Sequence, residues 1–335
     1  MSEKTFCDLT VYEEGTPMKH IFILNPAAGK GKPLAVFEDK LCKICAEKEV
    51  SFDIYRTKAV GDAFRFVRET CLSDTKTPLR FYACGGDGTI GEVVGGTVGF
   101  ENAEVAIVPM GTGNDFARFL GKKEIFLNIE NQIDAIAYPC DVIRWNEDRY
   151  CINMMNIGFD GEVAARARRA KRFFPGKFAY ICGVALEFFK MTKAKFRFIV
   201  DGRDLGIKKI LLSLYANGGF CGGGFFAAPY ADLHDGKMDI CLIRPVSRFT
   251  FLGLVGSYRK GTHMLHKKAD EYFEYYKCSD LRLEFEKPQR VCVDGEIEEC
   301  LSLHLEVLGG AVRLVLPAGA ETPKSSDSPL IIETV

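Results

Sequence analysis

Apolar positions along the first third of the chain follow two alternating periods. Residues 21–25 (IFILN) form a short continuous apolar run, which is typical of a strand buried on both faces. After a glycine-rich turn, apolar side chains recur at helical spacing, at Leu34, Phe37, Leu41, Ile44 and Cys45. Residues 52–57 (FDIYRT), 79–84 (LRFYAC) and 105–110 (VAIVPM) predict three more strands, with a helix after each. Strands that alternate with helices in this way predict a parallel sheet with helical crossovers.

Beyond about residue 139 the pattern becomes rich in strands. The segments with strand character, separated by turn dipeptides, are residues 141–155, 196–215, 237–243 and 281–317. They predict an antiparallel sheet or sandwich, interrupted by helices near residues 160–170, 178–191 and 247–260. The chain is therefore expected to fold as an α/β domain followed by a β-rich domain, which suits its length of 335 residues.

The composition is that of a globular protein and argues against several functions. A net charge of -1 gives no general excess of positive charge, so no nucleic-acid partner is expected. The 13 cysteines are scattered, and Cys42 and Cys45 fall in an amphipathic helical pattern, which favours reduced thiols over disulfides or a zinc site. The first residues are too polar for a signal peptide, and no apolar run reaches the roughly 18 residues that a transmembrane helix needs. A cytoplasmic protein is expected, with peripheral contact at a membrane left open.

A glycine-rich loop follows the strand predicted at residues 79–84. Gly85, Gly86 and Gly88 let the backbone approach a ligand closely, and N–H groups that open the next helix can point at phosphate oxygens. Asp87 could reach a metal-bridged phosphate or a ribose, and Thr89 offers a hydroxyl. Taken alone, this loop is equally consistent with a tight turn between strand and helix.

Two further glycine-bearing loops change that balance. NPAAGKGK (residues 25–32), which lacks the spacing of a Walker A loop, and PMGTGNDFAR (residues 109–118) also follow predicted strands. In the second loop, Asn114 or Asp115 is also well placed to cap a helix. The carboxyl ends of parallel strands meet at one edge of the sheet, where ligands bind. Three such loops at one edge predict a site for nucleotide phosphates.

In this order and spacing, the three loops resemble the diacylglycerol kinase catalytic domain, and bacterial soluble lipid kinases in particular. The likeness extends through NGGFCGGGFFAAPYADLHDGKMDICLI, GTHM and VCVDGEIEE, and covers roughly residues 18–316. It implies a fold like that of NAD and diacylglycerol kinases, with the active site in the cleft between two domains. The nucleotide-binding α/β domain would span residues 18–138 and be completed by about 306–318. A β-rich, sandwich-like domain for lipid and metal would span 139–305, followed by a tail at 319–335.

The resemblance implies a reaction and its residues. ATP, with Mg²⁺, would phosphorylate a lipid hydroxyl, with diacylglycerol giving phosphatidic acid as the leading case, and a homodimer is possible. The implied nucleotide-binding residues are Asn25, Gly29, Lys30, Thr57, Gly86, Asp87, Gly88, Thr89, Glu92 and Thr112. Glu296 of the DGE stretch is implied as the base, and Asp232, Asp235 and the carbonyl of Lys237 as the magnesium site. One departure is Gly91, where the family usually has asparagine.

Asp-Gly dipeptides have a plain structural interpretation, since they are the commonest pair in hairpin turns. They occur at Asp160, Asp201, Asp235 and Asp294. The resemblance gives a function only to Asp235 and to the DGE stretch, so Asp201 is predicted to be a turn alone.

The basic segment Arg166–Lys177 has two interpretations. It is either a solvated helix face ending in the buried pair Phe173 and Phe174, or an element that contacts an anionic membrane surface.

Two other functions compete with the lipid kinase. An NAD kinase uses a GGDGT loop in a related fold, but the GTGNDFAR stretch favours the lipid branch. A regulator that binds nucleotide or lipid without catalysis would not need Asp87, Asp235 and Glu296, all of which are present. The identity of the acceptor lipid is left open by the sequence.

Overall fold

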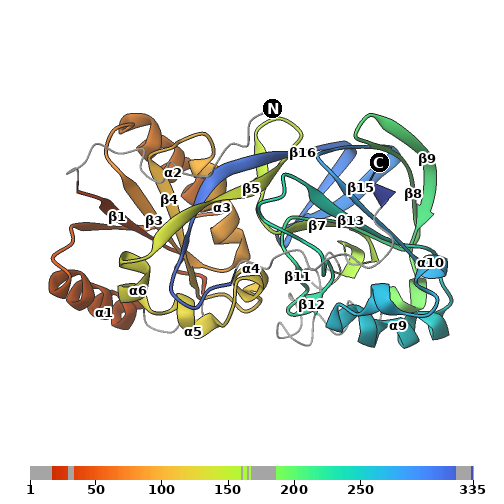
Figure 1. The fold of residues 1–335 in the computed structure, drawn as a ribbon, viewed down its shortest axis with the longest axis horizontal. Helices are drawn as coiled ribbons and strands as arrows, with labels where there is room; N and C mark the ends of the chain where they lie inside the picture. The colour runs from red at the N-terminus through yellow and green to blue at the C-terminus, as the bar shows by residue number, and fades with distance from the viewer. Residues whose placement is uncertain are drawn as a thin grey trace, which may run out of the picture.

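The computed structural model of the chain describes residues 17–28, 34–159, 161–163, 166, 186–321 and 333–334. Figure 1 shows two lobes side by side, with the parallel strands and their helices in one and the β-rich part with helix α9 in the other. The predicted fold class, a parallel α/β domain followed by a β-rich domain, is confirmed.

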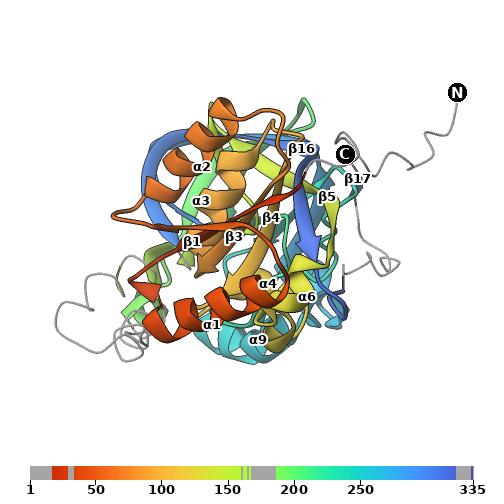
Figure 2. The ribbon, with the colours of Figure 1, turned by 90° about the vertical axis from the view of Figure 1, so that its left-hand side faces the viewer.

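The N-terminal lobe is built on four parallel strands. They are hydrogen-bonded in the order β4-β3-β1-β2, and their bounds are β1 (Lys19–Leu24), β2 (Phe52–Arg56), β3 (Leu79–Gly85) and β4 (Ala103–Pro109). Every residue of β3 and β4 is buried, because helices cover both faces of the sheet. Helix α1 (Leu34–Glu47) packs on one face, and α2 (Asp62–Ser73) and α3 (Asp87–Thr97) pack on the other (Figure 2).

One long strand belongs to both lobes. Strand β16 (Glu296–Leu316) pairs with β15 (Asp280–Val293) in the β-rich lobe and ends in parallel pairing with β4 of the first lobe. Strand β5 (Ile136–Trp145) runs antiparallel to it across the junction, with a break in register between Leu308 and Val312. The described strands of both lobes therefore form one continuous mixed sheet, apart from the small hairpin of β11 and β12.

The break in register is fastened by one carboxylate. Asp141 of β5 is buried, and its Oδ1 accepts the N–H of Gly310 at 2.8 Å. Gly310 has a φ of +62, a conformation that favours glycine, so the glycine at this position allows the strand to bend here. The Oδ2 of Asp141 accepts the N–H of Gly236 at 2.7 Å, which attaches the DLHDGK loop to the same junction.

The β-rich lobe carries most of the sheet. Strands β7 (Met154–Gly158), β10 (Leu212–Ala216), β13 (Met238–Ile243) and β14 (Phe273–Cys278) follow β15 in that order. Helix α9 (Arg248–Lys260) confirms the helix predicted near residues 247–260. The remaining elements are α4 (Asp115–Phe119), α5 (Lys123–Phe126), α6 (Ile129–Ile133), β6 (Arg149–Cys151), β8 (Ala194–Val200), β9 (Arg203–Ile210), β11 (Phe220–Cys221), β12 (Phe225–Phe226), the 3₁₀ turn η2 (His263–Leu265), α10 (Ala269–Tyr272) and β17 (Glu333–Thr334).

A buried ion pair joins the first lobe to the strand that returns to it. Arg80 of β3 is 5% exposed, and its Nη2 donates to Glu104 of β4 at 2.7 Å. Its Nε also donates to Glu104, at 3.0 Å, and other N–H groups of Arg80 donate to the carbonyls of Gln132 and Ile133 at the end of α6 and of Ala135 just beyond it. Glu104 also lies 3.6 Å from Arg313 of β16.

We expect Arg80→Leu to lower the free energy of unfolding by about 3–5 kcal/mol. The substitution removes one of the positive charges beside the buried Glu104, and it removes the hydrogen-bond donor of three backbone carbonyls. Denaturant unfolding followed by circular dichroism would measure it. Arg56→Leu is the control, since Arg56 pairs with Glu38 at the surface and should cost less than about 1 kcal/mol. Equal losses in the two variants would contradict this account.

Candidate active site

The glycine-rich loops meet at one edge of the sheet. Asn25 follows β1, Thr57 follows β2, the Gly86–Glu92 stretch follows β3, and Thr112 lies in the loop after β4. Backbone hydrogen bonds connect these loops, since the N–H groups of Met110 and Gly111 donate to the carbonyl of Gly85. Across the sheet, the amide of Asn25 donates to the hydroxyl of Thr89 at 2.9 Å. Gly29 and Lys30 lie outside the described residues.

Two of the glycines have different reasons to be glycine. A Cβ on Gly111 would lie 2.6 Å from the Cα of Gly86, so the two loops could not approach as they do. A Cβ on Gly88 would meet nothing within 4 Å, although this residue lies in the first turn of α3. The space above Gly88 is therefore open, at the positive end of a helix where an anion is stabilised.

Some predicted nucleotide-binding residues have structural contacts of their own. Both carboxylate oxygens of Glu92 accept N–H groups at the start of α2, from Gly61 at 2.7 Å and from Ala63 at 3.1 Å. Glu92 therefore caps α2. Thr89 is buried against Gly85, whereas Thr112 is exposed.

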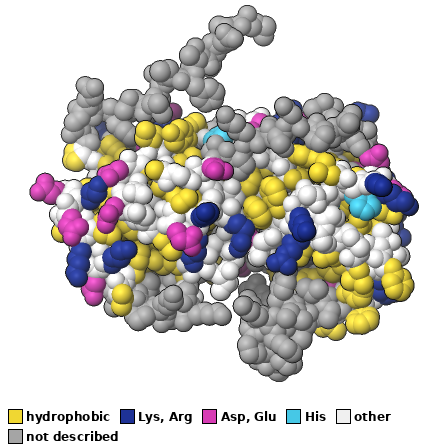
Figure 3. Space-filling model, turned by 60° about the horizontal axis from the view of Figure 1, so that its bottom comes forward, with side chains coloured by type: hydrophobic (Ala, Val, Ile, Leu, Met, Phe, Trp, Pro, Cys, Tyr) yellow, Lys and Arg dark blue, Asp and Glu magenta, His cyan; other side chains and the backbone are white. Residues whose placement is uncertain are grey.

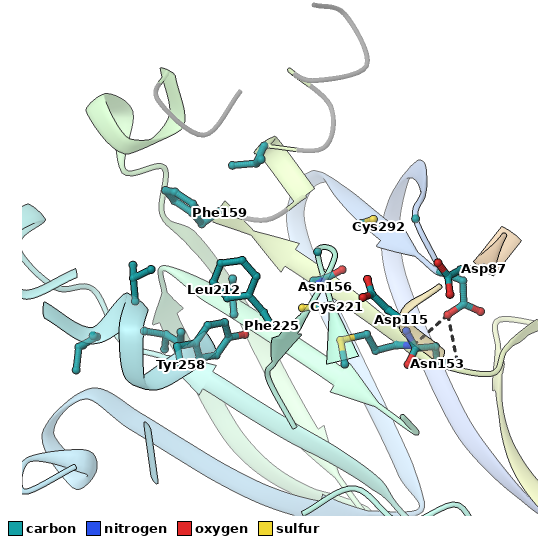
Figure 4. A pocket seen from close by; sticks show the side chains of 18 of the residues that line it. Asp87, Asp115, Asn153, Asn156, Phe159, Leu212, Cys221, Phe225, Tyr258 and Cys292 are labelled. Atoms are coloured by element: carbon teal, nitrogen blue, oxygen red, sulfur yellow. Dashed lines mark hydrogen bonds between the residues drawn. The ribbon is translucent and has the colours of Figure 1, made fainter. Parts of the chain in front are cut away.

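A pocket of about 330 Å³ opens between the two lobes, next to these loops. Its polar end is formed by Asp87, Asp115, Asn153 and Asp294. Its other end is apolar and comes from the β-rich lobe, with the lining residues Phe159, Val163, Leu212, Cys221, Phe225, Ile243, Phe251, Leu254, Val255, Tyr258 and Phe273. Figure 4 shows Asn156 between the acidic end and the apolar end.

Asp294 forms the floor of the polar end. It lies in the hairpin turn between β15 and β16, with a φ of 44, and Gly295 follows with a φ of 92. Its carboxylate accepts the N–H groups of Ile152, Asn153 and Met154 at 3.0–3.1 Å. Burial, with a smaller contribution from the charge of Asp87, raises the pKa of Asp294 to about 6.

The glycine at position 91 fits beside this carboxylate. A Cβ on Gly91 would lie 3.3 Å from Oδ2 of Asp294, so a larger side chain here would press on the floor of the pocket. The departure from the family pattern therefore goes together with the close approach of α3 to the β15–β16 turn.

Asp87 and Asp115 complete the acidic end. Asp87 accepts the N–H of Phe116 at 3.2 Å, and Asp115 accepts the N–H of Gly223 from the β-rich lobe at 2.8 Å. Burial raises the pKa of both carboxyl groups, and for Asp87 the charge of Asp115 adds to the effect. Asp115 is buried and Asp87 half-buried. Two carboxylates that repel each other in such a site are stabilised by a bound cation, and their oxygens are the ligands that Mg²⁺ prefers.

The DLHDGK loop lies apart from the pocket. Asp235 pairs with Lys277 at 2.6 Å and accepts the N–H of Lys237 at 3.0 Å, while Asp232 accepts the N–H of His234 at 3.0 Å. None of the three predicted magnesium ligands lines the pocket. Within the described ranges, no three acidic, histidine or cysteine side chains are grouped closely enough to hold a metal ion.

Glu296 directly follows two residues that line the pocket but does not line it itself. It is the first residue of β16 and is exposed, whereas Asp294, two residues earlier, lines the pocket. The sequence interpretation included Asp294 only as part of the DGE stretch, with Glu296 as its base, and gave no site role to Asp115 or Asn153. The signals were present only as a turn dipeptide and a possible helix cap. At α4 the cap position is Asn114, whose side chain donates to the carbonyl of Gly111 instead of capping the helix.

Comparison with known proteins places this architecture. The model of the diacylglycerol kinase catalytic domain matches residues 19–145, and that of the YegS C-terminal NAD kinase beta sandwich-like domain matches residues 153–316. A Pseudomonas aeruginosa protein named "Probable lipid kinase YegS-like" is 30% identical over 262 residues, which cover 78% of this chain and 83% of the other. The chain belongs to the diacylglycerol kinase catalytic-domain family of lipid kinases. The predicted family is thus confirmed.

Two further relatives align with nearly the whole of this chain. The "Diacylglycerol kinase" of Bacillus subtilis is 26% identical over 303 residues, which cover 88% of this chain and 95% of that one. A crystal structure of a diacylglycerol kinase from Bacillus anthracis shares the fold of the lipid kinase, with a TM-score of 0.66 at 21% identity, over 90% of this chain and 98% of that one.

Proposed function

We propose that this lipid kinase transfers the γ-phosphate of ATP, with Mg²⁺, to the hydroxyl of diacylglycerol and so forms phosphatidic acid. The observation that carries the proposal is the single pocket with two unlike ends. One end has carboxylates beside the glycine-rich loops, which suits phosphoryl transfer, and the other end is apolar, which suits an acyl chain.

The nucleotide would lie over the edge of the sheet. Asn25, Thr57 and Thr112 surround this edge, and the open space above Gly88 faces the start of α3. N–H groups at that helix terminus can stabilise phosphate oxygens, as in other phosphate sites. Gly29 and Lys30 of the first loop, outside the described residues, are proposed to bind the nucleotide as well.

Asp87 and Asp115 are proposed to hold the Mg²⁺ that accompanies the nucleotide. The ion would neutralise phosphate charge, which is most of what phosphoryl transfer requires of the site. The support is the pair of carboxyl groups, Asp115 buried and Asp87 half-buried, whose pKa burial raises at the polar end of the pocket. Asp232, Asp235 and Lys237 remain a proposed second magnesium site, at the junction of the lobes.

The acceptor hydroxyl would lie between the polar end and Asn156. Glu296 is proposed to take its proton, since it directly follows Gly295, which lines the pocket, and a carboxylate within hydrogen-bond reach of a hydroxyl can act as a base. Asp294 accepts three backbone N–H groups, so its proposed role is to hold the segment from Ile152 to Met154 in place.

The test is transfer of labelled γ-phosphate from ATP, with and without Mg²⁺, to a panel of lipid alcohols in mixed micelles. The panel would hold diacylglycerol, monoacylglycerol, a sphingoid base, undecaprenol and phosphatidylglycerol, with NAD as a further acceptor. Transfer to diacylglycerol above all others is expected. Transfer to another lipid would contradict the proposal that diacylglycerol is the acceptor. Transfer to NAD alone would contradict the proposal that the apolar end of the pocket binds a lipid.

Filling the apolar end should separate the acceptor from the nucleotide. We expect Val255→Trp to raise KM for diacylglycerol about tenfold or more, because the indole would occupy the space of the acyl chain, while ATP binding is unchanged. Steady-state kinetics and ATP titration would measure the two effects. Val36→Trp, exposed on α1 in the other lobe, is the control and should change neither. An unaltered KM in Val255→Trp would contradict the proposed position of the lipid.

A further inference from the structure

Large apolar side chains are exposed where α9 begins. Phe249 is 88% exposed, Phe189 69% and Leu252 59%. Phe249 and Leu252 are on the first turns of α9, and a surface groove lined by both runs between α9 and residues 188–193. Single exposed apolar residues are ordinary, but aromatic and aliphatic side chains gathered around one groove mark a contact surface.

The same groove is lined by cations. Lys190, Lys193 and Arg248 line it together with Phe249 and Leu252. Figure 3 shows hydrophobic and basic side chains on the lower face of the molecule, the side on which α9 lies in Figure 1. In the described part of the chain, no acidic side chain pairs with any of the three. Arg248 is held in place by the backbone carbonyls of Phe188 and Phe189.

An acidic residue close by in the sequence, Glu187, has its own cationic partner. Glu187 is fully buried and pairs with Arg166 at 2.9 Å, so its charge is balanced inside the protein. Arg166 is thereby engaged with Glu187 and Glu162, and the rest of the basic segment up to Lys177 lies outside the described residues. The positive charge beside the exposed phenylalanines therefore comes from Lys190, Lys193 and Arg248 of the groove, and not from Arg166.

A line of aromatic contacts connects this surface with the pocket. Phe159 and Phe251 line the pocket and lie 4.8 Å apart between ring centroids. Phe251 lies 6.1 Å from Phe188, and Phe188 lies 5.8 Å from the exposed Phe189. Helix α9 thus turns Phe251 and Leu254 toward the pocket and Phe249 and Leu252 toward the outside. Apolar side chains in mutual contact therefore extend from the exposed surface to the lipid end of the pocket.

We propose that Phe189, Phe249 and Leu252, together with Lys190, Lys193 and Arg248, form a docking surface for a bilayer that contains anionic lipids. Aromatic side chains would enter below the headgroups, and the cations would bind the headgroup phosphates. A bilayer fits better than a protein partner because the surface adjoins the lipid end of the pocket and combines exposed apolar side chains with one sign of charge. The inference rests on the proposed function only in that the acceptor is a membrane lipid. No helix among the described residues is long and apolar enough to cross a membrane.

Co-flotation of the full-length chain with vesicles tests the proposal. The vesicles are phosphatidylcholine alone, or phosphatidylcholine mixed with phosphatidylglycerol. The wild type should bind the anionic vesicles more tightly, with binding weakened by salt. Phe249→Ser with Leu252→Ser, and separately Lys190→Glu with Lys193→Glu, should each weaken that binding roughly tenfold or more. Leu301→Ser, a comparably exposed leucine on β16, is the control and should bind as the wild type does.

Phosphorylation of a short-chain, water-soluble diacylglycerol separates docking from catalysis. The docking variants should retain it, because none of the changed side chains lines the pocket. Vesicle binding equal to wild type in both double variants would overturn the proposal, as would a wild type that binds neither vesicle. A dimer that disappears in Phe249→Ser with Leu252→Ser, without vesicle binding, would assign the surface to a second copy. Vesicle binding that depends on these residues, without phosphorylation of any lipid, would support the docking surface and refute the proposed function.

Discussion

Glu296→Gln is expected to lower kcat for diacylglycerol by roughly 10²-fold or more, with little change in ATP affinity. This is the usual loss when a general base is removed, and glutamine keeps the size of the side chain while losing the capacity to take a proton. Glu296 directly follows the Asp294-Gly295 turn at the rim of the pocket. Steady-state rates in mixed micelles, together with thermal unfolding, would measure the effect. Glu299→Gln on the same strand is the matched control, since Glu299 pairs with Arg290 outside the pocket and should retain full turnover.

Asp294 is the competitor for the role of the base. Asp294→Asn should lower stability by about 1–3 kcal/mol, because an amide cannot accept all the backbone N–H groups that the carboxylate accepts. If Glu296→Gln keeps near-normal turnover while Asp294→Asn is folded and inactive, the proton acceptor is Asp294. If Glu296→Gln alone removes turnover, Asp294 serves to hold the floor of the pocket.

Gly88→Ala is expected to make the protein without nucleotide slightly more stable and to weaken ATP binding at least about tenfold. Alanine favours a helix over glycine by up to about 1 kcal/mol, and the new methyl group would meet nothing within 4 Å in the protein itself. The same methyl group would enter the space proposed for the phosphates. Thermal unfolding and calorimetric titration with ATP and Mg²⁺ would measure these opposite changes.

Two further glycine substitutions bracket that result. Gly253→Ala on α9 also meets nothing within 4 Å, so it should add stability without changing ATP affinity. Gly111→Ala should lose both stability and ATP binding, because its Cβ would lie 2.6 Å from the Cα of Gly86. ATP affinity in Gly88→Ala equal to that of the wild type would show that the phosphates lie elsewhere.

The parallel sheet could be predicted because the amino-acid sequence of each central strand is largely apolar, as a strand buried on both faces requires. Strands β3 and β4 are mostly apolar runs. When helical patterns separate such runs, few arrangements other than a parallel sheet covered by helices would bury them. The long course of β16 is different. The family likeness suggested that the last strand returns to the first lobe, but nothing in the local pattern states that one strand spans both lobes.

The two Asp-Gly hairpins show why the site was harder to predict than the fold. Asp201 and Asp294 have nearly the same φ, 45 and 44, and each carboxylate accepts backbone N–H groups of a neighbouring segment. Asp201 does so at the outer end of β8, as predicted for a turn, whereas Asp294 does so against α3 and the pocket. The local chemistry is the same, so only the tertiary position distinguishes a turn from a site.

Glu92 illustrates the reverse case. Its place three residues after GGDGT suggested a contact with nucleotide, which stays a prediction, and the structure adds that its carboxylate caps α2, which begins about thirty residues earlier in the chain. A cap contributed by a distant helix has no signature in the sequence of either helix.

The path of β16 also bears on the order in which the chain can fold as it is synthesised. Strand β4 is covered on one side only by β3 until the residues around Arg313 and Leu314 are available to pair with it. The first lobe is therefore translated almost two hundred residues before its sheet can be completed. During that interval β4 is an open edge, of the kind that invites pairing with other chains. The sheet of the N-terminal lobe can therefore be completed only after almost all of the β-rich lobe has been synthesised.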